Sequence, residues 1–398
     1  MSFDVNFSFS REPSTKISTQ IAVSGLVPAD NDVVLIGQMA ASGASATANV
    51  PVTIENFGDL DALQTEVDGL FGSGAKVGEM VMAAARAVQF SDLDPVALPT
   101  VRVIPMPNSL PDLAATLAAN DTLPMPFVAT DYKATDADDL SDFKDHLVAI
   151  SKSDRGPNAQ FGSFGFIADD ESLATMTPIA EGVARPEVVI PWLRDQNASV
   201  AQDPHEVAAA VCALCAANPF PFNPLNGIKV GGLVPPTDRS DYHTVGDSGT
   251  VATGLEAGLL PLTVDNGSNV RISRSVTASR RVTGIADSSY FDLQDWQTIY
   301  LIRKNIYNLA QQPRYKQAKA SDEKAQAFRS EVISSILKPL DGTVLQKVDE
   351  LADLFVYRRA EDNRSAFIFT IPLNVIPGFH NKGVGLIGTD LFDVTVIL

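Results

Sequence analysis

The feature that most constrains the fold is an alternation of strand-like and helix-like segments through residues 32–230. Short apolar runs alternate with longer stretches of helical periodicity, a pattern typical of a sheet with helices on its faces. The sequence therefore predicts an α/β domain over residues 28–254. Its predicted strands include 33–36, 101–104, 126–130 and 188–190, and its predicted helices include 59–70, 77–90, 138–150 and 204–217.

The region after residue 254 reads as a hairpin followed by a long helix. Asp265-Asn266-Gly267 is a turn signal between two apolar strand-like segments. Asp292 is placed to cap a helix, and Pro313 is placed to end it. A second helix at 321–338 and strands near 354–359 and 366–373 are expected to complete an α+β domain over residues 255–380.

Both ends of the chain alternate apolar and polar residues, as half-buried strands do. Residues 1–27 and 381–398 are therefore predicted to form strand arms. A strand with one apolar face needs a sheet to join, either in its own subunit or in a neighbouring one. The apolar arm residues are Ile17, Ile21 and Val23 at the N-terminal end and Phe392, Val394, Val396 and Leu398 at the C-terminal end.

A glycine-rich linker precedes the C-terminal arm, and Gly383, Gly385 and Gly388 are its candidate hinge residues. The segment matches the spacing of a dinucleotide-binding loop, but that role needs a following helix, and here a strand follows. A second near-match at residues 69–76, GLFGSGAK, has Ala75 where a phosphate-binding loop has lysine. Its glycines are better suited to a helix end and a turn.

The net charge of −18 is unevenly distributed, with −21 over residues 1–270 and +3 over residues 271–398. An acidic surface repels phosphate backbones, so direct nucleic-acid binding is not expected. No segment has the roughly 18 apolar residues of a membrane span, and no secretory signal is expected at the N-terminus. The two cysteines fit a reducing compartment.

The residues present can be compared with what two kinds of chemical site need, a zinc site and the active site of a serine hydrolase. His205, Cys212 and Cys215 lie on one face of a predicted helix and could ligate zinc, but no fourth ligand is evident and the helix is apolar. Core packing is therefore the favoured interpretation, with no metal and no cofactor. A serine hydrolase would need a nucleophile beside a histidine, and none of His146, His205, His243 and His380 has such a context.

Several motifs, in a consistent order, resemble those of contractile tail sheath proteins. The C-terminal set is Gly258–Leu262, Arg274–Thr277, Asp287–Asp292 and Pro313–Lys316. Residues 32–88, which contain DVVLIGQ and LFGSGAKVGEMVMAAARA, resemble the Mu-type phage sheath, as does PLNGIKVGGLVPPTDR at 224–239. Their order along most of the chain favours this family.

The resemblance implies a non-enzymatic structural subunit without a cofactor. The family has a subtilisin-like α/β middle domain, which lies outside, and an inner α+β domain. Its terminal arms pair with neighbouring subunits. Six-subunit rings stack around a tail tube and contract to drive the tube through the host envelope. The implied partners are further copies of the chain, the tail tube protein, and baseplate and tail terminator proteins. The implied location is the virion tail, assembled in the host bacterial cytoplasm.

The charge split adds one expectation to this interpretation. The less acidic C-terminal portion is expected to face the tube or a neighbour, through the candidate cations Arg271, Arg274, Arg280 and Arg281. Two alternatives stay open at this point. The chain could be the sheath of a secretion system or of an extracellular contractile injection system, or it could be a cryptic serine hydrolase with an α/β fold.

Overall fold

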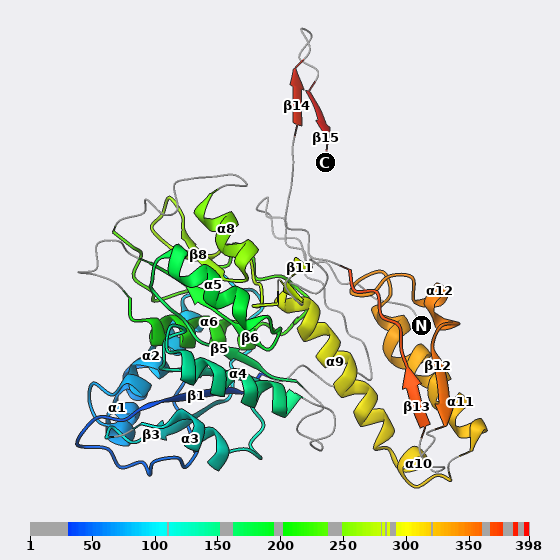
Figure 1. Cartoon of the computed structure of the whole chain (residues 1–398), viewed down its shortest axis with the longest axis horizontal. Coiled ribbons are helices and arrows are strands. Elements are labelled where there is room, and N and C mark those ends of the chain that lie inside the picture. Colours follow the sequence, from blue (N-terminus) through cyan, green and yellow to red (C-terminus); the bar gives the residue numbers. More distant parts are fainter. Residues whose placement is uncertain are drawn as a thin grey trace, which may run out of the picture. The chain divides into compact units, whose positions relative to one another are not determined.

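The computed structural model describes residues 31–109, 111–151, 162–194, 202–237, 249–279, 281–282, 285–286, 292–319, 321–359, 367–376, 385–388 and 394–397 (Figure 1). The chain divides into two compact units. One unit spans Pro28–Tyr307 and includes Val375–Leu398, and the other contains Asn308–Asn374.

The first unit is built on a six-stranded sheet with the order β2-β3-β1-β4-β5-β6. All of these strands run parallel to their neighbours except β2, which pairs antiparallel with β3 at one edge. The strands are β1 (Val33–Gln38), β2 (Val52–Thr53), β3 (Val101–Met106), β4 (Phe127–Thr130), β5 (Phe164–Phe166) and β6 (Val188–Val189).

Helices cover both faces of this sheet because its central strand is apolar on both sides. Val33 and Leu35 of β1 belong to one buried cluster, together with α1 (Leu60–Phe71), α2 (Lys76–Gln89) and α6 (Pro204–Ala217). Val34 and Ile36 point the other way, into a cluster with α3 (Leu113–Ala119), α4 (Ala137–Ser151) and α5 (Leu173–Val183). The predicted mixed α/β fold is confirmed.

The strand order places a topological switch point between β1 and β4. The chain passes from β1 to β3 on one side and then to β4 on the other side of β1. Ligands of open α/β sheets bind in the crevice at the carboxyl ends of strands at such a point. Asp131 follows β4 there, and its Oδ2 accepts a hydrogen bond of 3.0 Å from the Gln38 N–H at the end of β1.

A second, three-stranded sheet in the same unit contains the predicted hairpin. Its strands are β7 (Pro191–Trp192), β8 (Leu260–Val264) and β9 (Val270–Ile272). Asp265 and Asn269 close the turn between β8 and β9, and Ser268 rather than Gly267 takes a positive φ, of 59°. The predicted domain boundary at residues 254 and 255 lies within α8 (Thr250–Ala257), which precedes this hairpin.

The predicted long helix is α9 (Leu293–Ala310), and Pro313 begins a further short helix, α10 (Pro313–Lys316). The second unit continues with α11 (Asp322–Val332), a π-helical turn η2 (Ile333–Leu337), η3 (Lys338–Leu340) and α12 (Val348–Ala352). The antiparallel pair β12 (Val356–Arg359) and β13 (Phe367–Thr370) follows. Phe369 joins the pair to α11, because its ring centroid lies 5.0 Å from that of Phe328.

Two small strand pairs complete the described chain. The strands β10 (Arg281–Val282) and β11 (Ile285–Ala286) form an antiparallel pair. The second pair consists of β14 (Gly385–Gly388) and β15 (Val394–Ile397), also antiparallel. Each pair is a separate two-stranded sheet.

The close approach of Gly165 in β5 to α4 allows the packing of this helix against the sheet to be tested. A Cβ at Gly165 in β5 would lie 2.2 Å from Leu147 Cδ1 and 2.6 Å from Phe143 Cε1, both in buried side chains of α4. Overpacking of this kind typically costs about 1–3 kcal/mol, so Gly165→Ala should lower the free energy of unfolding by about 2 kcal/mol. Chemical denaturation of the purified variant measures this change.

The matched control is Gly182→Ala in α5, where nothing lies within 4 Å of the added Cβ. Alanine is the better helix former by about 0.5–1 kcal/mol, so this variant should be slightly more stable than the parent chain. Equal stability of the two variants would contradict the packing of α4 against β5.

Candidate functional site

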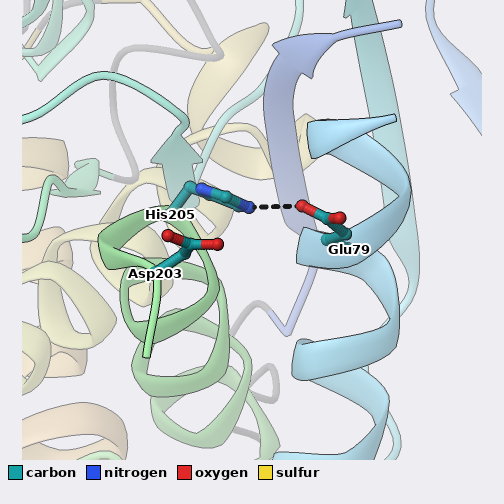
Figure 2. Close-up of side chains that lie close together, drawn as sticks. All are labelled: Glu79, Asp203 and His205. Carbon is teal, nitrogen blue, oxygen red and sulfur yellow. Dashed lines mark hydrogen bonds and ion pairs between the residues drawn. The ribbon is translucent and has the colours of Figure 1, made fainter. Parts of the chain in front are cut away.

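A cluster of two carboxylates and one imidazole lies where α2 and α6 begin. Figure 2 shows Glu79, from the first turn of α2, facing His205, from the first turn of α6, with Asp203 beside it. His205 Nε2 lies 2.9 Å from Glu79 Oε2. One ligand atom from each of the three residues lies within 4.8 Å of the other two. We call Glu79, Asp203 and His205 the α2–α6 cluster.

The three side chains differ in exposure. His205 is only 7% exposed, whereas Glu79 is half-buried and Asp203 is exposed. Asp203 stands at the N-cap position of α6, but within the described chain its carboxylate accepts no capping hydrogen bond from that helix. The Asp59 carboxylate, by contrast, caps α1.

Two further carboxyl groups, those of Glu206 and Asp131, lie near the α2–α6 cluster. Burial raises the pKa of Glu206, against the charge of His205 and a hydrogen bond from Gln202, and the charges of Glu79 and Asp203 add to the rise. Asp131 is 6% exposed, and its Oδ1 has no hydrogen-bond partner among the described residues. Burial raises the pKa of Asp131, opposed by the Gln38 N–H and by the charges of Lys76 and His205.

The cysteines take no part in this arrangement. Cys212 and Cys215 are fully buried in α6 and pack in the core, as the sequence predicts. Burial raises the pKa of both thiols. The structure thus brings His205 to Glu79 and Asp203 rather than to a zinc set with the cysteines.

The two glycine-rich near-motifs have structural roles. Gly72, in the GLFGSGAK segment, follows α1 with φ of 83° and donates its N–H to Asp68 O, as a helix C-cap does. The next helix begins at Lys76. Gly385 and Gly388 are the ends of β14, and Gly383 lies outside the described residues.

Two of the four candidate cations are paired within the chain. Arg271 donates to Asp265 Oδ2 at 2.7 Å and to Asp92 Oδ2 at 2.6 Å. Partial burial acts to raise the pKa of Asp92. Hydrogen bonds from the Lys229 N–H and from Arg271 outweigh this effect and hold that pKa below its usual value. Hydrogen bonds from Asn269 and Arg271 likewise lower the pKa of Asp265.

Arg274 forms the more buried pair. Its guanidinium binds both oxygens of Asp292, at 2.7 and 2.8 Å, and the Asp292 side chain is only 6% exposed. This fork–fork contact ties the end of the β8–β9 hairpin to the start of α9. Arg281 begins β10, and Arg280 lies outside the described residues.

Asp295 lies in the first turn of α9, next to this pair. Burial raises its pKa to about 7, and the charge of Asp292 adds to the rise while Arg274 opposes it. Its Oδ1 has no hydrogen-bond partner in the described part of the chain. Asp292 and Asp295 are therefore two buried carboxyl groups, of which the first is paired with Arg274 and the second has a raised pKa.

Asp295→Asn should stabilise the protein at pH 8 by about 2 kcal/mol and have little effect at pH 4. An unfolded aspartate loses its proton near pH 4, whereas the folded one keeps it to about pH 7, so folding stability falls as pH rises between these values. Urea unfolding of both proteins across this range measures the difference. A gain that is the same at every pH would contradict it.

The structure gives partial information on the predicted arms. Val394 and Val396 lie in β15, which pairs with β14 of the same chain. Ile17, Ile21, Val23, Phe392 and Leu398 lie outside the described residues. Among the described helices, none has the length and apolar character needed to cross a membrane.

Neither a protein-family profile nor a curated protein sequence matches the chain. Solved structures do. The sheath tail protein Lin1278 from Listeria innocua superposes with a TM-score of 0.62 at 11% identity, over 90% of this chain and 95% of that one. The anti-feeding prophage helical sheath in its contracted state gives a TM-score of 0.60 at 12% identity, over 96% of this chain and 100% of that one.

A third match is the sheath tail protein DSY3957 from Desulfitobacterium hafniense, with a TM-score of 0.56 at 10% identity. It covers 94% of this chain and 100% of that one. At these identities the likeness establishes the fold alone. It extends over nearly the whole chain, and the matched proteins are structural sheath proteins. The resemblance in the sequence is thereby confirmed at the level of structure: this chain has the fold of contractile tail sheath proteins.

Proposed function

We propose that this chain is the subunit of a contractile phage tail sheath. Stacked hexameric rings of it surround a tail tube, and their contraction drives the tube through the host envelope. The observation that carries the proposal is the shared fold over 90–96% of the chain with sheath tail proteins and with a helical sheath. The parts of such an assembly are further copies of this chain, the tail tube protein, and baseplate and tail terminator proteins.

Electron microscopy of the purified protein is the direct test. We expect hollow tubes with sixfold symmetry, because a sheath subunit carries its own polymer contacts. A protein that stays monomeric at high concentration, or that forms closed particles of another symmetry, would contradict the proposal.

We assign the outer position to the α/β domain and the inner position to the C-terminal α+β domain. The parallel sheet with helices on both faces supports a subtilisin-like middle domain. The C-terminal arm is the β14–β15 pair. Gly385 and Gly388 lie within β14, so Gly383, which precedes that strand, is the remaining candidate for its hinge. A two-stranded sheet is marginal by itself, which favours completion by a neighbouring subunit.

Contacts to the tube should be weak and ionic, so that the sheath can move over the tube. Arg271 and Arg274 are paired within the chain, so a contact of either one with the tube or a neighbour would compete with that pairing. Arg280 and Arg281 stay candidates on the basis of the sequence. Exposed ion pairs are screened by salt, so the association of tube with sheath should weaken as salt rises while the sheath itself persists. Cosedimentation across a salt series measures both, and salt-independent binding of the tube would contradict the ionic contact.

The proposed role is structural rather than enzymatic. The matched proteins are sheath components, and both thiols are buried with raised pKa values, which disfavours a cysteine nucleophile. An active-serine probe tests the hydrolase alternative, and no serine should be labelled.

An extracellular contractile injection particle is the second candidate, favoured by the likeness to the anti-feeding prophage sheath. Micrographs of particles from producing cells separate the two. Sheaths attached to filled capsids indicate a phage tail, and sheaths without capsids indicate an injection particle.

A further inference from the structure

We propose that Glu79, Asp203 and His205 form a binding site for one divalent transition-metal ion of the zinc class, which links α2 to α6. The first argument is geometric. Zinc held by nitrogen and oxygen at about 2.0–2.1 Å separates tetrahedral ligand atoms by about 3.3 Å. The ligand atoms of the α2–α6 cluster already lie within 4.8 Å of one another, and His205 Nε2 and Glu79 Oε2 are 2.9 Å apart.

The donor set selects the class of metal. Magnesium and calcium prefer ligand sets made of oxygen, whereas imidazole suits zinc and its neighbours in the first transition row. One imidazole and two carboxylates provide three protein ligands and leave a position for water. Two ligands come from the start of α6, one at its N-cap and one in its first turn, and the third comes from α2, so the ion would cross-link two helices of the same sheet face.

The position in the fold supports a ligand independently. Asp131 follows β4 at the switch point of the parallel sheet, and of the α2–α6 cluster it is the charge of His205 that acts to lower the pKa of its carboxyl group. Asp131 is more than nine-tenths buried, and its Oδ1 has no partner among the described residues. Asp131, Glu79, Asp203 and Glu206 thus place four carboxyl groups near one histidine, and the nearby cations include Lys76 and Arg86. A bound cation would offset this excess of negative charge.

The competing explanation is a direct His205–Glu79 ion pair that holds α2 against α6 without a metal. The two explanations differ in the role of Asp203. An ion pair between His205 and Glu79 does not need Asp203, whereas a metal site loses a ligand when Asp203 changes. Asp203 is exposed, so its substitution does not disturb the core.

The experiment titrates the full-length, chelator-treated protein with zinc chloride. We expect one zinc ion per chain by calorimetry, and a thermal unfolding midpoint raised by about 3–5 °C at saturating zinc. Asp203→Asn should weaken zinc binding about 100-fold, a loss at the upper end of that seen when metal-site partners are removed. The unliganded variant should unfold at the parental temperature.

Two controls separate this site from other binding. Asp138→Asn changes an exposed carboxylate at the start of another helix, α4, and should leave zinc affinity unchanged. Cys212→Ala with Cys215→Ala removes the alternative ligands on α6 and should also leave affinity unchanged. A cobalt-loaded parent protein should lack a thiolate-to-metal charge-transfer band, because the proposed ligands are nitrogen and oxygen.

Equal zinc affinity in Asp203→Asn and Asp138→Asn would overturn the proposal, and the His205–Glu79 ion pair would then explain the cluster without a metal. Loss of binding in the double cysteine variant, or a thiolate band with cobalt, would assign the metal to the cysteines instead. His205→Ala and Glu79→Gln extend the test, and each should lose zinc binding if it folds. None of these outcomes depends on tube formation, so the site can fail while the proposed sheath function stands.

Discussion

Deletion of residues 389–398 should give a folded subunit that no longer forms tubes. The deletion removes β15 (Val394–Ile397) and leaves β14 without its partner strand. A two-stranded sheet in water is marginally stable, so the β14–β15 pair needs a further sheet to join, and we assign that sheet to a neighbouring subunit. Pairing of the backbone and burial of the apolar arm residues, at about 25 cal/mol per Å², are worth several kcal/mol per subunit. Sedimentation and electron microscopy at matched concentrations measure the loss.

The controls distinguish lost assembly from lost folding. The truncated protein should keep the circular dichroism and unfolding midpoint of the unassembled parent, because among the described residues the two buried clusters contain none after 300. Val394→Asp with Val396→Asp should reproduce the defect, whereas Thr395→Val, on the opposite face of the same strand, should not. Removal of residues 1–24 should act like the C-terminal deletion. Normal tubes from the truncated protein would contradict the arm assignment.

The main elements were predictable because their periodicity is strong and their residues act locally. Val33–Ile36 is apolar throughout and forms the central strand, and the predicted helices 77–90 and 204–217 correspond to α2 and α6 within a residue. The turn after β8 was also predictable, because Asp265 and Asn269 bond to each other across it. In each case the deciding interactions lie within a few residues in sequence.

Two of the elements that were not predicted from the sequence, α5 and β5, carry conflicting signals. The helix α5 contains Pro178 in its interior, and proline there removes a hydrogen-bond donor and argues against a helix. The strand β5 is only three residues long, Phe-Gly-Phe, and Gly165 at its centre weakens any strand pattern. That glycine is required by the packing of α4, which local sequence does not reveal.

The candidate site lay beyond sequence reasoning for a similar reason. His205 and Glu79 are 126 residues apart, and only the packing of α6 against α2 brings them together. The spacing of His205, Cys212 and Cys215 in one helix pointed instead to ligands that the fold buries. Arginine residues on an alternating strand suggested an outward surface, but the partner of Arg271 at Asp92 is 179 residues away. Positions along a strand can be read from sequence, whereas partners across the fold cannot.

Arg274→Ala should destabilise the protein more than Arg271→Ala does, with a loss of about 3 kcal/mol in the free energy of unfolding. Its guanidinium holds both oxygens of Asp292, whose side chain is 6% exposed, so the variant leaves a buried carboxylate without its cation. Breaking a buried pair at one partner typically costs about 3–5 kcal/mol, and the partial exposure of Arg274, 28%, places this pair at the lower end.

The loss should also grow with pH, since Arg274 is the charge that opposes the raised pKa of Asp295. Without that cation, two neighbouring carboxylates must both ionise in a buried site as pH rises to 8. Urea unfolding at pH 5 and pH 8 should therefore show a larger defect at pH 8, and Asp295→Asn in the same chain should remove that difference. Arg271→Ala is the matched control, because its partners Asp92 and Asp265 are more exposed and the loss should be small and weakened by salt. If Arg271→Ala proved as destabilising as Arg274→Ala, burial of the Arg274–Asp292 pair would not be what stabilises the start of α9.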